Sequence, residues 1–195
     1  MLRRLPVYLM VDCSGSMKGD PIKKARAGLD SILSALLADP AAVRCVYLSV
    51  ITFGNEAKTL TPLTPLLDFK APDLSVPPDG GGSFLGAAFE LLEERVLQEL
   101  RKDDWPPLVF LLTDGKPSDT ANYKRTTRRV QAGEIREIWP QNIIACVVGS
   151  KADPKALHEL TENVLLLNAL TTSEITNYIS DFFYDDYDEL FYSSF

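Results

Sequence analysis

Three short, uninterrupted apolar runs limit the fold of this chain more than any other feature of its sequence. They are VYLMV at residues 7–11, LVFLL at 108–112 and IIACVV at 143–148. A strand that is apolar on both of its faces is typical of a parallel sheet with helices packed on each side. The runs therefore predict a sheet whose central strands are buried.

A fourth apolar stretch differs from these because a turn follows it. Residues 43–53 (VRCVYLSVITF) are rich in β-branched side chains, and Gly54-Asn55 leads from them into residues 56–61. A two-residue turn of this kind joins antiparallel strands. We therefore expect one antiparallel strand at an edge of the sheet.

Segments with helical periodicity alternate with the strands. In the first of them, apolar residues recur at helical spacing from Pro21 to about Ala38, with Asp20 expected as the N-cap and Asp39-Pro40 expected to end the helix. Further helices are expected at residues 83–101, 123–138, 154–160 and 173–183, with a last strand at 164–167. This order predicts an α/β fold: a three-layer, doubly wound, Rossmann-like sheet that is mostly parallel, with one antiparallel edge strand and helices on both faces.

Length and charge restrict the domain organisation and the partners. The 195 residues suffice for one domain with its own core. We expect residues 1–183 to form that domain, and the acidic, aromatic residues 184–195 to be either a part of it or a docking segment. The formal net charge of −7 argues against sequence-independent binding to nucleic acid, which depends on Lys and Arg. Four basic residues at helical spacing are expected to form a solvated face: Lys124, Arg125, Arg128 and Arg129.

The sequence also bears on the cellular compartment. No apolar run approaches the ~20 residues of a membrane span, and the apolar stretch after Arg3-Arg4 is at the lower limit for a signal sequence. Cys13, Cys45 and Cys146 are far apart and form neither a disulfide framework nor a metal-binding pair. Cys45 and Cys146 lie in apolar runs and are expected to be buried, reduced thiols. We therefore expect a cytoplasmic protein with no membrane contact.

Three polar clusters lie where a doubly wound sheet binds its ligands, beyond the carboxyl ends of the strands. They are DCSGS directly after the first apolar run, DGGGS before the second predicted helix, and TDG directly after LVFLL. In the first cluster, alternate residues of an extended segment point to the same side. The candidate metal ligands are Asp12, Ser14, Ser16, Ser83 and Asp114.

These side chains offer oxygen atoms alone. Hard divalent ions such as Mg²⁺ and Ca²⁺ prefer oxygen ligands, and Mg²⁺ requires six of them in an octahedron, usually with some water. Two carboxylates and three neutral hydroxyls leave much of the ion's charge uncompensated. Such an ion can accept one more anionic oxygen from outside the chain.

The motifs together resemble the metal-ion-dependent adhesion site of von Willebrand A domains, which is written D-x-S-x-S, then T, then D. The first element is matched in full, Asp114 matches the last, and Ser83 stands where the family has threonine, a change that keeps the hydroxyl. The likeness covers nearly the whole chain, including the order of its elements. It implies that Ser14, Ser16 and Ser83 contact the ion directly, while Asp12 and Asp114 act largely through water.

Within that family, the sequences VYLMVDCSGSM, GGGSFLGAA and LVFLLTDGKPSD look most like small stand-alone bacterial members found with tellurite-resistance and related stress-response systems. Members of that group are associated with protein kinases and phosphatases. The resemblance implies a non-enzymatic adaptor in a signalling complex. Its metal ion, Mg²⁺ in the first place and Mn²⁺ or Ca²⁺ as alternatives, would bind an Asp or Glu carboxylate of a partner protein.

Two other functions stay open. Asp12 could be the nucleophile of a metal-dependent phosphohydrolase, although Ser14 stands where the DxDx[TS] pattern has a second carboxylate. Alternatively, the metal site is incidental and residues 184–195 bind the partner. A Ser–His–Asp triad is not expected, because the single histidine, His158, lies among apolar neighbours and is interpreted as a packing or surface residue. The DGGGS loop lacks a phosphate-binding glycine pattern, since Leu85 occupies the third glycine position.

Overall fold

One six-stranded sheet forms the centre of the molecule. A computed structural model of the chain describes residues 3–149 and 153–167. The order of the strands is β3-β2-β1-β4-β5-β6, and all neighbours are parallel except β2 and β3, which form the predicted antiparallel pair. The strands are β1 (Leu5–Asp12), β2 (Val46–Phe53), β3 (Ala57–Pro65), β4 (Leu108–Thr113), β5 (Ile143–Val147) and β6 (Val164–Leu166).

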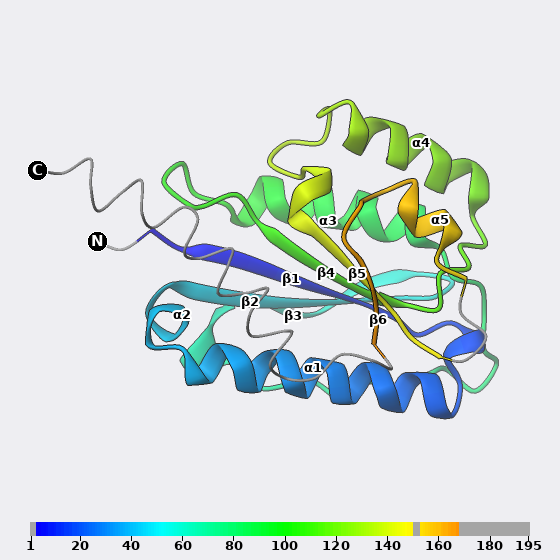
Figure 1. Cartoon of the computed structure of the whole chain (residues 1–195), viewed down its shortest axis with the longest axis horizontal. Coiled ribbons are helices and arrows are strands. Elements are labelled where there is room, and N and C mark those ends of the chain that lie inside the picture. The colour runs from blue at the N-terminus through cyan, green and yellow to red at the C-terminus, as the bar shows by residue number, and fades with distance from the viewer. Residues whose placement is uncertain (1–2, 150–152, 168–195) are drawn as a thin grey trace, which may run out of the picture.

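Helices cover both faces of the sheet, which confirms the predicted three-layer, Rossmann-like architecture. Helices α1 and α2 lie on one face, and α3, α4 and α5 lie on the other (Figure 1). The helices are α1 (Asp20–Ala38), α2 (Pro40–Cys45), α3 (Leu85–Glu99), α4 (Thr120–Gln131) and α5 (Lys155–His158). Single turns of 3₁₀ helix occur at Gly15–Met17, Leu66–Asp68 and Pro140–Asn142.

The apolar runs are continuous because the sheet separates two cores. All eight residues of β1 are buried. Val7, Leu9 and Val11 pack in the core beneath α1, whereas Tyr8 and Met10 pack in the core beneath α3. A strand that contributes to both cores has no face left for polar side chains.

Two expectations about the first helix need correction. Asp20 is not the N-cap: it is the first residue of α1, where it pairs with Lys24 at 2.9 Å, and Gly19 precedes it with a φ of +89°. Helix α1 ends at Ala38 as predicted, but Asp39 then caps a new helix by accepting a hydrogen bond from the backbone N–H of Ala41 at 2.8 Å. The strand expected from residue 43 therefore begins at Val46.

The polar helix α4 is shorter at its C-terminus than predicted. It ends at Gln131 rather than near residue 138, because Gly133 adopts a φ of +67° and the Trp139 ring lies against it. On its outer face, Arg125 and Arg129 form ion pairs with Glu90 and Glu93 of α3, at 2.6 and 2.7 Å. The basic residues of this helix thus form a solvated, partly paired face, as expected.

Cys45 and Cys146 are buried, as expected. All three cysteines are buried and free, and His158 is exposed at the end of α5. In the part of the chain that the structure describes, no helix is long and apolar enough to cross a membrane. The helix predicted at 173–183 and the tail at 184–195 lie outside the described residues.

We predict that Gly86→Ala destabilises the protein, although alanine favours helices by about 1 kcal/mol over glycine. A Cβ at residue 86 would lie 2.7 Å from the backbone nitrogen of Tyr123, so α3 and α4 would have to separate. Overpacking of this kind costs about 1–3 kcal/mol. Urea unfolding measures the change, with Ala87→Gly as the control for helix propensity. A more stable Gly86→Ala variant would contradict the close approach of the two helices.

Candidate metal centre

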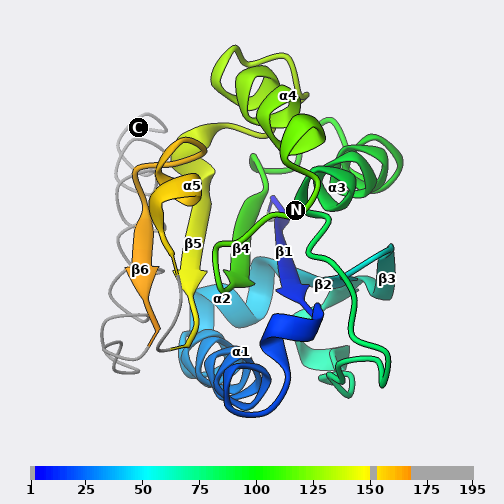
Figure 2. The ribbon, with the colours of Figure 1, turned by 90° about the vertical axis from the view of Figure 1, so that its right-hand side faces the viewer.

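The candidate site lies where the order of the strands reverses. From β1 the chain proceeds to β2 on one side, and it later returns to place β4 on the other side. Figure 2 shows β1 and β4 side by side, with their carboxyl ends at the same edge of the sheet. Because Val11 pairs with Leu112, the next residues of the two strands, Asp12 and Thr113, lie beside each other.

The Asp12 carboxylate is the centre of a hydrogen-bond cluster. It is completely buried, with an exposed fraction of 0%. Its Oδ1 accepts a hydrogen bond from the backbone N–H of Ser14 at 2.8 Å, and its Oδ2 accepts from Ser83 Oγ at 2.8 Å and Thr113 Oγ1 at 2.7 Å. Burial raises the pKa of Asp12, and these donors oppose the rise because they stabilise the charged form.

Two serine hydroxyls extend this cluster towards the surface. Ser14 is buried and Ser16 is exposed, and their Oγ atoms lie 3.1 Å apart. Neighbouring ligands in a Mg²⁺ octahedron with bonds of about 2.1 Å are about 3.0 Å apart. The spacing of the two hydroxyl oxygens therefore fits one edge of such an octahedron.

The glycine-rich loop brings Ser83 to the same place. Gly15 N–H donates to the carbonyl of Gly81 at 3.0 Å, and a Cβ on Gly15 would lie only 3.3 Å from the Gly81 nitrogen. Asn55 Oδ1 accepts from the N–H of Gly82 at 2.7 Å, which fixes the loop to the β2–β3 turn. Glycines are needed here because two backbones meet without space for side chains.

Ser118 holds the other side of Ser83. Its Oγ accepts a hydrogen bond from the Ser83 N–H at 3.0 Å, and its own N–H donates to the Ser83 carbonyl at 2.7 Å. The Ser83 hydroxyl is thereby left to donate to Asp12. Both backbone groups of this residue are satisfied without water.

Asp114 lies at the site through its position after β4. It is buried, and its Oδ1 accepts a hydrogen bond from the N–H of Lys116 at 3.2 Å. Within the described residues, no direct hydrogen bond joins its carboxylate to the other predicted ligands. The structure thus links Asp12, Ser14, Ser16 and Ser83 in one chain of contacts and places Asp114 next to it.

Thr113 is a site residue that the sequence reasoning missed. It is completely buried, donates to Asp12, and accepts a hydrogen bond from the Gly115 N–H at 3.1 Å. The available signal was its position in TDG directly after a buried strand.

The described residues contain no group of three or more His, Cys, Asp or Glu side chains able to hold a metal. A metal ion bound here would therefore need ligands besides these four residue types, and the nearby hydroxyl oxygens can supply them.

We predict that Thr113→Val destabilises the protein by about 1–3 kcal/mol, because two buried hydrogen bonds lose their partner while the shape is kept. Thr113→Ser keeps the hydroxyl and is the matched control, which should lose less stability. Urea unfolding without added metal measures both. No loss of stability in Thr113→Val, or a larger loss in Thr113→Ser than in Thr113→Val, would contradict the structural role of the hydroxyl.

Comparison with known proteins supports the same assignment of fold. Inter-alpha-trypsin inhibitor heavy chain H4 of Bos taurus is 29% identical over 141 residues, which are 66% of this chain and 15% of the relative. The chain therefore spans a small part of that protein. Among solved structures, mussel byssus proximal thread matrix protein 1 with a zinc-occupied metal-ion-dependent adhesion site has a TM-score of 0.59 at 15% identity, covering 89% of this chain and 45% of that one.

A second solved structure, manganese-loaded TRAP protein of Plasmodium vivax, has a TM-score of 0.55 at 17% identity and covers 79% of this chain and 61% of that one. At these identities both structures show a common fold. The family model of the von Willebrand factor type A domain matches the sequence over residues 7–184, most of the chain. On this evidence, the chain belongs to the von Willebrand factor type A domain family.

Proposed function

We propose that this chain is a non-enzymatic, metal-dependent protein-binding module. In this proposal the chain holds one divalent ion that accepts an Asp or Glu carboxylate from a partner protein. The observation that carries it is the oxygen cluster around Asp12, in which donor and acceptor oxygens lie 2.7–3.1 Å apart. The ligands would be Asp12, Ser14, Ser16, Ser83 and Asp114.

The hydrogen bonds of the cluster orient hydroxyl lone pairs. Ser83 donates its proton to Asp12, so the remaining lone pairs on Ser83 Oγ are available to a cation. Ser14 and Ser16 share one hydrogen bond and have further lone pairs of their own. The bound ion supplies a positive charge that attracts anionic oxygens.

The arrangement also leaves a direction open for a partner. Asp12, Ser14 and Ser83 are almost completely buried, whereas Ser16 is exposed. An outside ligand must therefore approach from the side of Ser16. Since most of the proposed ligands are neutral, a carboxylate arriving there would meet uncompensated positive charge.

The chemistry of the ligands favours Mg²⁺, with Mn²⁺ or Ca²⁺ as alternatives. Zinc occupies the adhesion-site motif in the mussel protein, and the Plasmodium protein is loaded with manganese. The mussel structure supports a divalent ion at this motif, and the Plasmodium structure supports the binding of a divalent ion by a protein of this fold. Their identity to this chain is too low to carry over a particular metal.

Burial argues against the phosphohydrolase alternative. Asp12 has no exposed surface, and both of its oxygens are engaged in hydrogen bonds, so a phosphate ester cannot reach it in this arrangement. Domains of the von Willebrand A type generally act as interaction modules, and the relatives named above carry no enzymatic names.

A narrower role rests on the sequence likeness alone. We include in the proposal that the chain works in the cytoplasm as an adaptor of a bacterial tellurite-resistance or stress-response complex, with a kinase or phosphatase complex as partner. The competing scaffold function, in which the metal site is incidental, depends on residues 184–195, outside the described residues. Pull-down with a chain that lacks these residues, beside one with Ser14→Ala and Ser16→Ala, separates the two functions.

We predict that saturating Mg²⁺ raises the melting temperature of the protein. Binding to the folded state alone stabilises by about 2.7 kcal/mol when the free ion is at 100 times its Kd. The double variant Ser14→Ala, Ser16→Ala should lose this response, because two ligand oxygens are removed. Differential scanning calorimetry with and without Mg²⁺ measures the shift.

A matched control is Ser31→Ala with Ser34→Ala, since both serines lie on the exposed side of α1 and donate to carbonyls of their own helix. This control should keep the full response to Mg²⁺. No shift of the wild-type protein in millimolar Mg²⁺, Mn²⁺ or Ca²⁺ would refute the metal site. Phosphatase activity that requires Mg²⁺ and disappears in Asp12→Asn would refute the non-enzymatic function.

We further predict that Asp12→Asn stabilises the metal-free protein by about 1 kcal/mol or more and abolishes its response to Mg²⁺. Because burial raises the pKa of Asp12, its charge weakens the metal-free fold at neutral pH. Ser83 and Thr113 can accept as well as donate, so an amide can replace the carboxylate. The gain should shrink as the pH falls towards the ordinary carboxyl pKa of 3.8, since protonation removes the same charge from the wild type. Urea unfolding across this pH range checks the sign.

A further inference from the structure

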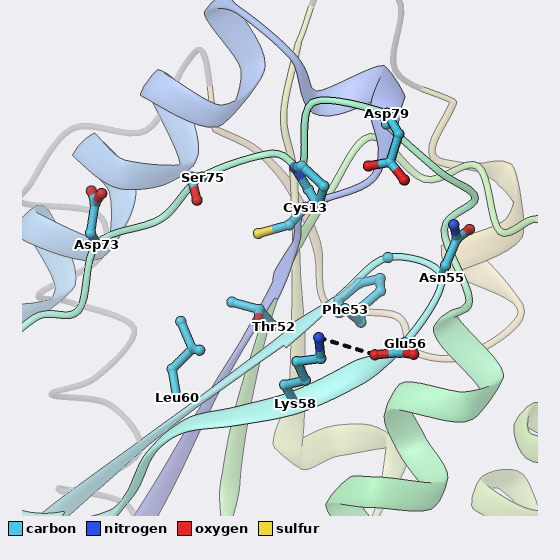
Figure 3. A pocket seen from close by; sticks show the side chains of 13 residues that line it. Cys13, Thr52, Phe53, Asn55, Glu56, Lys58, Leu60, Asp73, Ser75 and Asp79 are labelled. Carbon is cyan, nitrogen blue, oxygen red and sulfur yellow. Dashed lines mark ion pairs between the residues drawn. The ribbon is translucent and has the colours of Figure 1, made fainter.

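A groove lies beside the candidate metal centre. Its volume is about 400 Å³. One wall is formed by residues 52–60 of the β2–β3 hairpin and the other by residues 73–80, with Cys13 between them (Figure 3). None of the ligands proposed above lines it.

The groove shares its backbone with the metal centre. Cys13 stands between Asp12 and Ser14 in the chain, and its N–H donates to the carbonyl of Phe53 at 2.7 Å. The Cα of Gly80 lies 3.4 Å from the place where a Cβ of Gly15 would be. A chain segment whose carboxylate reaches the exposed Ser16 therefore has the groove next to it.

Charge in the groove is predominantly negative. Three carboxylates line it, those of Glu56, Asp73 and Asp79, against one ammonium group, that of Lys58. Lys58 is already paired with Glu56 at 3.0 Å, and Asp73 is paired with Arg26 at 3.1 Å. The Asp79 carboxylate is exposed and has no hydrogen bond or ion pair with any described residue.

The Cys13 thiol is an independent sign of a place for a ligand. The residue is 93% buried, given its exposed fraction of 7%, and its sulfur points into the groove in Figure 3. Among the described residues, the thiol group itself has no hydrogen-bond partner. A cysteine side chain offers a soft, weakly polar surface to a ligand.

The shape suits a long cationic side chain. Cys13 provides a small apolar surface at the base, and Leu60 stands at the rim with 43% of its surface exposed. The aliphatic stem of a lysine or arginine can pack on such a surface while its charged end reaches carboxylates. In Figure 3, Glu56 and Asp79 lie towards the same end of the groove.

The wall at residues 73–80 needs little reorganisation to accept a ligand. Pro77 and Pro78 restrict its backbone, and the carbonyl of Pro77 accepts the N–H of Gly80 at 2.9 Å in a tight turn. A wall that is ordered before binding reduces the entropy lost on association.

We propose that this groove selects protein partners in which a lysine or arginine accompanies the carboxylate that binds the metal ion. The inference rests on the proposed function, since the metal ion binds the carboxylate of the partner segment and the groove binds the basic side chain beside it. A second acidic residue at that position would be repelled by Asp79 and Glu56. The groove therefore contributes specificity, and the metal ion contributes the anchor.

The test is a selection from a displayed library of short random peptides with a fixed central Asp. Peptides are captured on the immobilised protein in Mg²⁺ and released with a chelator. The wild type should enrich lysine and arginine within about four positions of the Asp, the reach of a short extended segment. The variant Glu56→Gln, Asp79→Asn should capture peptides without this enrichment and should bind a selected basic peptide about fivefold more weakly.

A control with the same change of charge is Asp103→Asn with Glu162→Gln, because both of these residues are exposed and neither lines the groove. It should keep the basic enrichment and the wild-type affinity. Peptides released by the chelator but lacking basic residues would refute the selectivity of the groove and leave the metal-dependent function intact. If the control variant lost as much enrichment and affinity as Glu56→Gln, Asp79→Asn, the selectivity of the groove would also be refuted, since general charge would then explain the preference. No chelator-released peptides at all would overturn both proposals.

Discussion

The buried carboxylate of Asp12 is the interaction on which the site depends. A charge without access to water is costly unless donors surround it, and here the donors come from three separate segments: the turn after β1, the end of the glycine-rich loop and the end of β4. Bringing them together requires the close backbone contact of Gly15 with Gly81 and the fixation of Gly82 by Asn55. The geometry of the loops at this edge therefore follows from the need to satisfy one anion.

Much of the fold could be predicted because a strand that is buried on both faces has an uninterrupted apolar sequence. The uninterrupted apolar runs identified β1, β4 and β5, and the Gly54-Asn55 turn identified the antiparallel edge. The errors occurred where a short-range contact decides the outcome. Asp39 follows the end of α1 as expected, but its side chain also caps the new helix α2. The packing of Trp139 on Gly133 ends α4 earlier than its periodicity predicts. Neither contact changes the periodicity of the sequence.

The site was predictable to the extent that it depends on spacing. Alternation in an extended segment places Asp12, Ser14 and Ser16 together, and the ends of parallel strands bring the clusters to one edge. Thr113 was missed because its role depends on the register of β4 against β1, which spacing along one segment cannot give. Asn55 and Ser118 act on backbone groups 27 and 35 residues away, so their roles follow from the loop conformation rather than from a motif.

The groove and the metal centre are linked through charge. Carboxylates at Glu56 and Asp79 produce a negative potential that favours a cation nearby, with a range of about 10 Å at moderate salt. The same carboxylates oppose the arrival of the partner's own carboxylate. A partner that also brings a lysine or arginine cancels this repulsion while it fills the open side of the ion. Because binding free energies are reciprocal, any partner that binds more tightly with the ion present must tighten the ion by the same factor. Because most of the proposed ligands are neutral hydroxyls, the carboxylate of the partner can then supply a large share of the free energy that holds the ion.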